Sequence, residues 1–214
     1  DLAAQATGVP PSEALVCSTG RIGVQLPLDR IETAIPKLAA ALSRDAAHDA
    51  ARAIMTTDTV PKEVSVAFEV GGVPVGLGAI CKGAGMICPN MATMLCFIAT
   101  DLAIAPGPLR EALRAAVARS FNCISVDGDM STNDTVIILA NGAAGNSPIT
   151  SSADPGYDTF TRALNYCTEQ LAKKIAADGE GASKFVTVRV TGAASYPDAY
   201  GVARHVTRYN LLKS

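Results

Sequence analysis

One threonine of this chain lies where a hydroxyl group could act as a nucleophile. Thr93 falls in segment 90–95, which reads Asn-Met-Ala-Thr-Met-Leu and runs into an apolar stretch. Its hydroxyl could attack the carbonyl carbon of Ala92, and the cut would leave Thr93 as a new N-terminal residue whose α-amine is its own base. The alternative is a purely structural residue, because β-branched side chains favour strands. The segment therefore indicates either a self-cutting precursor or the entry to a strand.

Two glycine-containing loops could complete the machinery of acyl transfer around this threonine. Such chemistry needs a nucleophile, a base and hydrogen-bond donors aimed at the developing oxyanion. Lys82 opens the flexible turn 82–86, eleven residues before Thr93, and Thr19-Gly20 lie in a second glycine loop. We expect Lys82 to bring a basic side chain to the site and Thr19-Gly20 to bring the donors.

The sequence offers no recognisable metal site. Six cysteines are scattered through apolar runs without a C-x-x-C pair, and two histidines, His48 and His205, cannot complete a zinc set. The acidic stretch 127–134 begins like a calcium loop, but Thr132 replaces the required glycine and Ile138 the required glutamate. We therefore expect buried free thiols, surface histidines and a polar turn that ties two core strands together near the active site.

Composition narrows the class of protein. The 214 residues are 49% hydrophobic and 18% charged, which favours a folded domain over a disordered chain. A net charge of −2, no tryptophan and no basic run argue against nucleic acid and anionic membranes as partners. No signal peptide and no apolar run of about 20 residues is present, so we expect a cytoplasmic protein. The first residue is Asp1, so we expect a processed chain or a fragment.

Hydrophobic periodicity predicts a mixture of strands and helices. Gly71-Gly72 between two alternating runs predicts a β-hairpin. The expected strands are 14–17, 64–70, 73–80, 95–99, 123–126, 135–140 and 184–190, and the expected helices are 28–42, 46–55, 108–120, 157–177 and 197–207. This mixture predicts an α+β fold, arranged as an α/β layered sandwich with mixed sheets.

Segments 82–86 and 90–95 together closely resemble the self-cleavage site of the ornithine acetyltransferase family, the glutamate N-acetyltransferases of arginine biosynthesis. Further segments agree with that family in order and spacing over most of positions 12–195. They are Ser-Thr-Gly at 18–20, Ile-Met-Thr-Thr-Asp-Thr at 54–59, Ser-Val-Asp-Gly-Asp at 125–129, Ser-Thr-Asn-Asp at 131–134 and Asp-Gly-Glu-Gly-Ala at 178–182.

The resemblance implies an N-terminal-nucleophile-like acyltransferase architecture. Residues 1–92 would belong to the α-chain side of the precursor and residues 93–214 to the β-chain side of one composite domain. The family's late Asp-Pro-Asn-Trp-Gly motif is absent, so we expect a domain that is incomplete at both ends.

The resemblance also implies two sets of site residues. The catalytic set is Thr93, Thr19 and Gly20, and the substrate-binding set is Thr56, Lys82, Thr93 and Glu180. A cationic Lys82 suits a substrate carboxylate and an anionic Glu180 suits an amine. The alternatives are that Lys82 is a solvated loop lysine and that Glu180 only caps a turn.

The implied reaction moves an acetyl group from N-acetylornithine to glutamate through acetyl-Thr93. The family needs no metal or organic cofactor, although acetyl-CoA could serve as a second donor. The implied partners are the amino-acid substrates, the two chains of the cleaved precursor and further copies in a homo-oligomer. Two other classes stay open: an N-terminal-nucleophile aminopeptidase, and a non-catalytic fragment that only binds amino acids or a partner chain.

Overall fold

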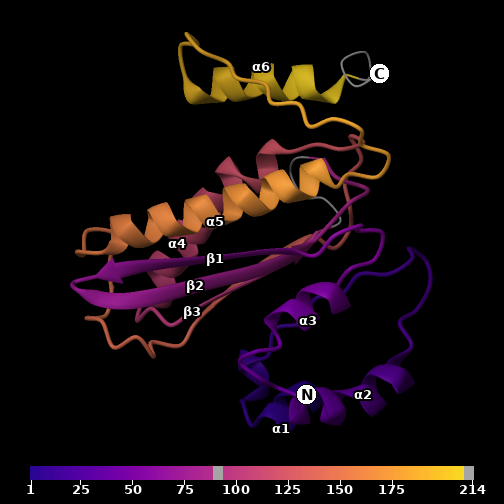
Figure 1. The fold of residues 1–214 in the computed structure, drawn as a ribbon, viewed down its shortest axis with the longest axis vertical. Helices are drawn as coiled ribbons and strands as arrows, with labels where there is room; N and C mark the ends of the chain where they lie inside the picture. The colour runs from indigo at the N-terminus through magenta and orange to yellow at the C-terminus, as the bar shows by residue number, and fades with distance from the viewer. Residues whose placement is uncertain (89–93, 210–214) are drawn as a thin grey trace.

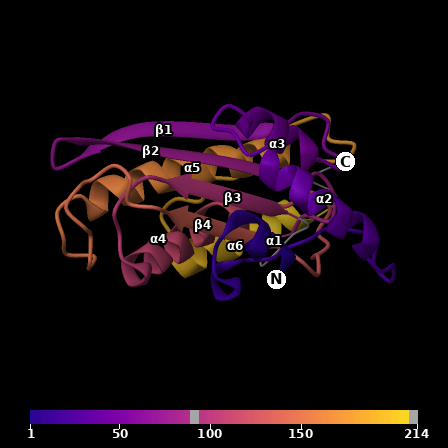
Figure 2. The same ribbon diagram turned by 90° about the horizontal axis from the view of Figure 1, so that it is seen from below.

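A computed structural model describes residues 1–88 and 94–209 (Figure 1). Within these ranges one mixed sheet has the strand order β1-β2-β3-β4, which Figure 2 shows from below. The strands are β1 (Lys62–Val70), β2 (Val73–Lys82), β3 (Leu95–Thr100) and β4 (Thr135–Ala140). The first three are antiparallel neighbours, and β4 runs parallel to β3. A parallel neighbour needs a crossover connection, which α4 (Pro106–Arg119) provides.

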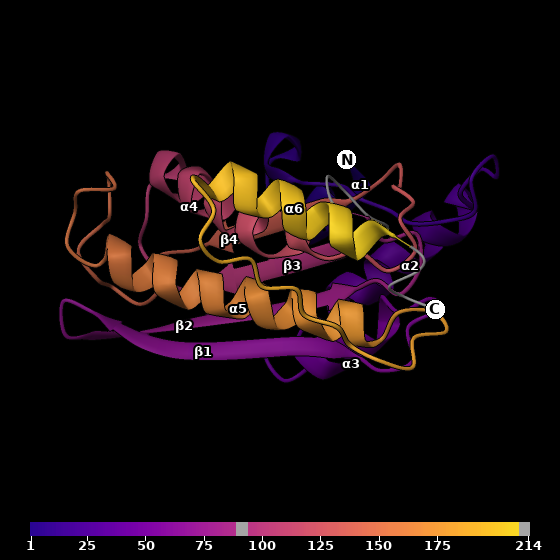
Figure 3. The same ribbon diagram turned by 90° about the horizontal axis from the view of Figure 1, so that it is seen from above.

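Helix α5 (Tyr157–Ala177) covers β1 and β2 and lies beside α4 (Figure 3). Its buried side chains recur at helical spacing, with Phe160, Leu164, Leu171 and Ile175 all fully buried. They meet the alternate inward side chains of β2, so the core lies between the sheet and this helical layer. The layer and the sheet together confirm the predicted α+β class.

The remaining helices lie outside this core. Helix α1 (Leu2–Thr7) contacts α2 (Leu28–Ala40), while α3 (Ala47–Ala53) contacts β1 and β2. Helix α6 (Tyr196–Arg208) lies beyond the α4–α5 layer, on the side away from the sheet (Figure 1). Two short 3-10 helices are η1 (Pro11–Glu13) and η2 (Phe121–Cys123). None of the helices in the described ranges is long and apolar enough to cross a membrane.

Most predicted elements are confirmed, with shifts of a few residues at their ends. The hairpin turns at Gly71-Gly72 as predicted, and α5 has the predicted bounds. Pro36 lies inside α2. His48 and His205 are exposed on α3 and α6.

Three predicted strands are wrong. Residues 14–17 are irregular with Val16 88% exposed, residues 121–123 form η2, and residues 184–190 join no sheet in the part of the chain described. A strand needs a hydrogen-bonded partner, which local alternation does not reveal. The thiol prediction holds for Cys81, Cys88, Cys96 and Cys167, but Cys123 is exposed and Cys17 is only partly buried.

Candidate functional site

The predicted cleavage position falls in the connection between two antiparallel strands. Lys82, the last residue of β2, pairs with Leu95, the first residue of β3, so residues 83–94 link the two strands. Ala92 and Thr93 lie outside the described residues. Met94, the next residue along the chain, is 4% exposed. Its amide donates to Asp134 Oδ1 at 2.8 Å, and its carbonyl accepts from the Thr135 amide at 3.0 Å.

Lys82 is a buried strand residue, which corrects both the flexible-turn placement and the alternative of a solvated loop lysine. Its side chain ends β2 with 2% of the residue exposed. Burial lowers the pKa of this ammonium, and the nearby carboxylate of Asp58 is the main group that opposes the shift. Among the described residues the ammonium has no hydrogen-bond or ion-pair partner. The site therefore offers a buried cation that is available to an anion.

Glu180 lies against the segment that follows Lys82, although almost a hundred residues separate the two in the chain. Its amide donates to the Ala84 carbonyl at 2.7 Å. Its carboxylate lies over Gly85, where an added Cβ would come within 2.6 Å of Glu180 Cδ. A glycine is needed here because any larger residue would displace the carboxylate. The structure therefore brings the predicted carboxylate-binding and amine-binding side chains to one end of the sheet.

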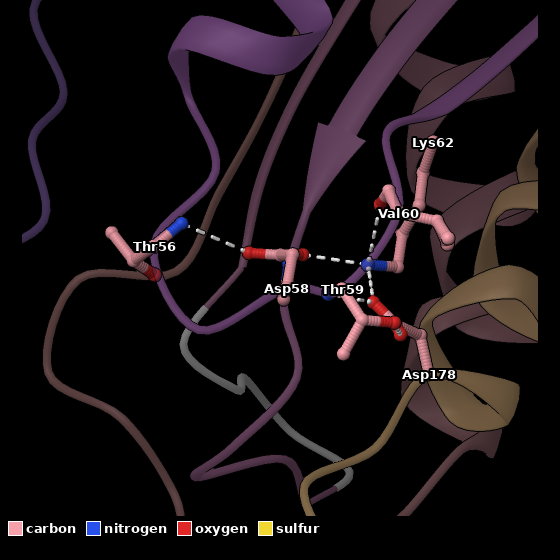
Figure 4. A network of polar contacts seen from close by, with 7 residues as sticks. Thr56, Asp58, Thr59, Val60, Lys62 and Asp178 are labelled. Carbon is pink, nitrogen blue, oxygen red and sulfur yellow. Dashed lines mark hydrogen bonds and ion pairs between the residues drawn. The ribbon is translucent and has the colours of Figure 1, made fainter.

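Thr56 joins the same region through a shared carboxylate (Figure 4). The Thr56 amide donates to Asp58 Oδ2 at 3.2 Å, and the Gly83 amide donates to Asp58 Oδ1 at 2.7 Å. Burial alone would raise the pKa of Asp58, but hydrogen bonds from Gly83, Lys62 and Thr56 hold it below its ordinary value. Asp58 is therefore an anion that fixes two of the predicted binding segments to each other.

Sequence reasoning missed Lys62, the first residue of β1. Its ammonium makes ion pairs with Asp58 at 2.6 Å and with Asp178 at 2.5 Å (Figure 4). The i,i+4 spacing of Asp58 and Lys62 was a weak local signal. Asp178 lies more than a hundred residues away, so no local pattern indicates the second pair.

The predicted oxyanion loop is tied to the turn that holds Met94. The side-chain amide of Asn133 donates to the carbonyl of Ser18, the residue before Thr19 and Gly20. Asn133 precedes Asp134, whose carboxylate accepts from the Met94 amide. Thr19 and Gly20 are therefore attached, through one short turn, to the residue that follows Thr93. Their roles as oxyanion donors stay a prediction.

The acidic stretch 127–134 holds the 83–94 connection at two points. Asp127 accepts hydrogen bonds from the amides of Met86 and Ile87, and Asp134 accepts from Met94. Its predicted role as a polar turn near the site is therefore refined: it fixes a loop and not two strands. Burial raises the pKa of Asp134 to about 6. Nowhere in the described ranges do three or more His, Cys, Asp or Glu side chains gather as metal ligands would.

These features define an α+β protein with a two-charge site, one buried cation and one carboxylate, at one end of its sheet. The sequence model of the ArgJ family matches residues 1–214. The chain therefore belongs to the ArgJ family, which confirms the resemblance found in the sequence.

Similar proteins carry the same family name. The arginine biosynthesis bifunctional protein ArgJ of Symbiobacterium thermophilum is 54% identical over 213 residues, which cover 100% of this chain and 53% of that protein. The protein of the same name from Geobacter sulfurreducens is 51% identical and is covered to 54%, again by 100% of this chain. The mitochondrial form of Candida albicans is 49% identical over 210 residues, covering 96% of this chain and 48% of that protein. The chain thus spans about half the length of these relatives.

A solved structure supports the fold. The crystal structure of the arginine biosynthesis bifunctional protein ArgJ from Bacillus halodurans superposes with a TM-score of 0.52 at 44% sequence identity. The superposition covers 53% of this chain and 53% of that one. The shared fold therefore extends over about half of the residues of each chain.

Proposed function

We propose that the complete protein moves an acetyl group from N-acetylornithine to glutamate through an ester on Thr93. One observation carries this proposal: Glu180 lies against the segment that follows Lys82 at the end of β2, and the paired strand β3 begins at Leu95, two residues after Thr93. An amino-acid substrate has a carboxylate and an amine, which are the complements of these two side chains. The relatives are named as arginine biosynthesis proteins, in agreement with this assignment.

The first step is self-cleavage. The Thr93 hydroxyl attacks the Ala92 carbonyl, the peptide bond to the Thr93 nitrogen breaks, and an ester forms in its place. Water hydrolyses the ester, which leaves a carboxylate on Ala92 and a free amine on Thr93. That amine, with a reference pKa of about 7.7–8.0, can accept the hydroxyl proton in later turnovers.

Acetyl transfer then proceeds in two half-reactions. Thr93 attacks the acetyl carbonyl of N-acetylornithine, and ornithine leaves as the free amine. The amine of glutamate attacks the acetyl-Thr93 ester, forms N-acetylglutamate and restores the hydroxyl. Lys82 binds the substrate carboxylate, Glu180 binds the substrate amine, and Thr56 also contacts the substrate. Thr19 and Gly20 stabilise the oxyanion. No metal or organic cofactor is required, and acetyl-CoA is a candidate second donor.

The two chains produced by the cut should stay together. Strand β2 precedes the cut and β3 follows it, and they pair from Leu77 with Thr100 to Lys82 with Leu95. Cys81 and Cys96, which face each other in this ladder, are both fully buried. Separation would break the sheet and expose its core. A cytoplasmic homo-oligomer of the cleaved protein is part of the same proposal.

The self-cleavage step can be tested by the intact mass of the protein expressed from its complete reading frame. The wild type should give two chains, the second beginning at Thr93, while Thr93→Ala should give one. A single uncut chain in the wild type would contradict the processing step.

The transfer step can be tested by measuring ornithine release with and without glutamate. Release that depends on glutamate supports the transferase. Release at the same rate without glutamate, or hydrolysis of peptides, indicates an aminopeptidase instead. Binding of amino acids with neither activity indicates a non-catalytic protein.

A further inference from the structure

The buried ion triad Lys62–Asp58–Asp178 lies outside the set of residues that the proposed reaction uses. Lys62 has no exposed surface, and its ammonium reaches three acceptors: Asp58 Oδ1 at 2.6 Å, Asp178 Oδ2 at 2.5 Å and the Val60 carbonyl at 3.4 Å. A lysine ammonium has three donors, so each of them has an acceptor here. The triad carries one net negative charge. Burying its charged groups costs desolvation free energy, which their hydrogen bonds and ion pairs must offset.

The triad is attached to the three segments that carry Thr56, Lys82 and Glu180. Asp58 accepts from the amide of Thr56 and from the amide of Gly83, the residue after Lys82. Asp178 accepts from the Thr59 amide at 3.0 Å. It precedes Glu180 by two residues, and the Glu180 amide donates to the Ala84 carbonyl. The positions of Thr56, Lys82 and Glu180 are therefore set from one junction.

The triad also includes a carboxylate that acts on the Lys82 ammonium. The charged groups that act on the Lys82 ammonium are Asp58, Lys62, Asp134 and Glu180, and Asp58 is the strongest of them. Both oxygens of Asp58 are already engaged, Oδ1 by Lys62 and the Gly83 amide, and Oδ2 by the Thr56 amide. Asp58 is thus held by Lys62 and makes no ion pair with Lys82.

We propose that Lys62, held between Asp58 and Asp178, occupies Asp58, so that the Lys82 ammonium stays free for the substrate carboxylate. Lys62 is a positioning residue, since it acts through Asp58 and Asp178 and not on the substrate. Without Lys62, Asp58 becomes an unpaired buried carboxylate beside a buried ammonium. Pairing between Asp58 and Lys82 then competes with substrate binding.

The test compares two acetyl donors, N-acetylornithine and its α-carboxamide, in the full-length protein. This inference rests on the proposed function in one respect, that Lys82 binds the donor carboxylate. The wild type should prefer the carboxylate by about 10- to 150-fold in kcat/KM, the value of a charge-assisted hydrogen bond. Lys62→Met should lose most of this preference. If Lys62→Met is not recovered folded, Lys62→Gln takes its place. This variant keeps an N–H donor in the triad but loses the charge that pairs with Asp58, and it should lose most of the preference as well.

Two further variants separate positioning from a general loss of stability. The double variant Lys62→Met/Asp58→Asn removes the competing carboxylate and should restore the preference. Phe160→Leu alters a fully buried side chain that packs on Phe68, away from the triad, and should lower stability without changing the preference.

The outcomes distinguish this inference from the proposed function. A wild type without any preference contradicts the role of Lys82, and the inference falls with it. A wild-type preference that persists in folded Lys62→Met or Lys62→Gln overturns the inference alone. A double variant that stays as unselective as the single one also overturns it, because Asp58 would then not be the competitor.

Discussion

Gly85→Ala is expected to move one site carboxylate while leaving the fold intact. The new Cβ would lie 2.6 Å from Cδ of Glu180 and 2.7 and 2.8 Å from its two oxygens. Gly85 has no left-handed backbone that alanine would resist. Glu180 is exposed and its carboxylate ends a flexible side chain, so the carboxylate moves and the backbone does not. The free energy of unfolding should change by less than about 1 kcal/mol.

The catalytic cost follows from the interaction that is lost. A hydrogen bond to a charged group contributes about 1.5–3 kcal/mol, and each 1.4 kcal/mol is a factor of about ten. Gly85→Ala should therefore lower kcat/KM for an amine-bearing substrate by about 10- to 150-fold. Steady-state ornithine release measures it. Gly78→Ala is the matched control, because its added Cβ would meet no heavy atom within 4 Å.

A double-mutant cycle decides whether Glu180 is the cause. In the Glu180→Ala background the obstructed carboxylate is absent, so adding Gly85→Ala should cost almost nothing further. An equal loss in both backgrounds, or no loss in the wild-type background, would refute the reasoning.

Three further predictions concern stability and can be measured by urea unfolding. Asp134 has a pKa of about 6 in the folded protein, above its ordinary value of 3.8. Its contribution to the free energy of unfolding is therefore fully present below pH 3.8 and is lost as the pH rises through 6. The stability of Asp134→Asn relative to the wild type should increase across that range. Met86 has φ +57°, so Met86→Val should cost about 1–3 kcal/mol while Met86→Gly should not. Gly156 has φ +91°, and a Cβ added there would lie 2.5 Å from Val70 Cγ1. Gly156→Ala should therefore lower the free energy of unfolding by about 1–3 kcal/mol. Unchanged unfolding midpoints would contradict each assignment.

The elements that could be predicted from the sequence are those whose signal is local. Helix α5 carries its whole apolar stripe within 157–177, and the hairpin of β1 and β2 has its turn marked by Gly71-Gly72. The segment 184–190 alternates equally well, yet it joins no sheet in the described part of the chain. Alternating apolar and polar side chains show that a segment is compatible with a β-strand, but strand formation also depends on a neighbouring strand elsewhere in the chain.

The site was predictable only as separate pieces. Motifs indicate Lys82 and Glu180, but the glycines after Lys82 hide the end of β2, so the sequence predicts a flexible turn there. Lys62 was missed because one lysine at the start of a strand is ordinary, and Asp178, which makes it exceptional, comes from the end of α5. Contacts between distant segments follow from the packing of α5 on the sheet and leave no local trace.

The most direct test of the account is to trap the acyl group. The full-length protein is mixed with N-acetylornithine without glutamate, quenched in acid and mapped by peptide mass spectrometry. The account predicts a chain that begins at Thr93 and carries a hydroxylamine-labile acetyl ester on the Thr93 hydroxyl, lost when glutamate is added before the quench. An uncut chain, an acetyl group on another residue, or an ester that glutamate does not remove would contradict it.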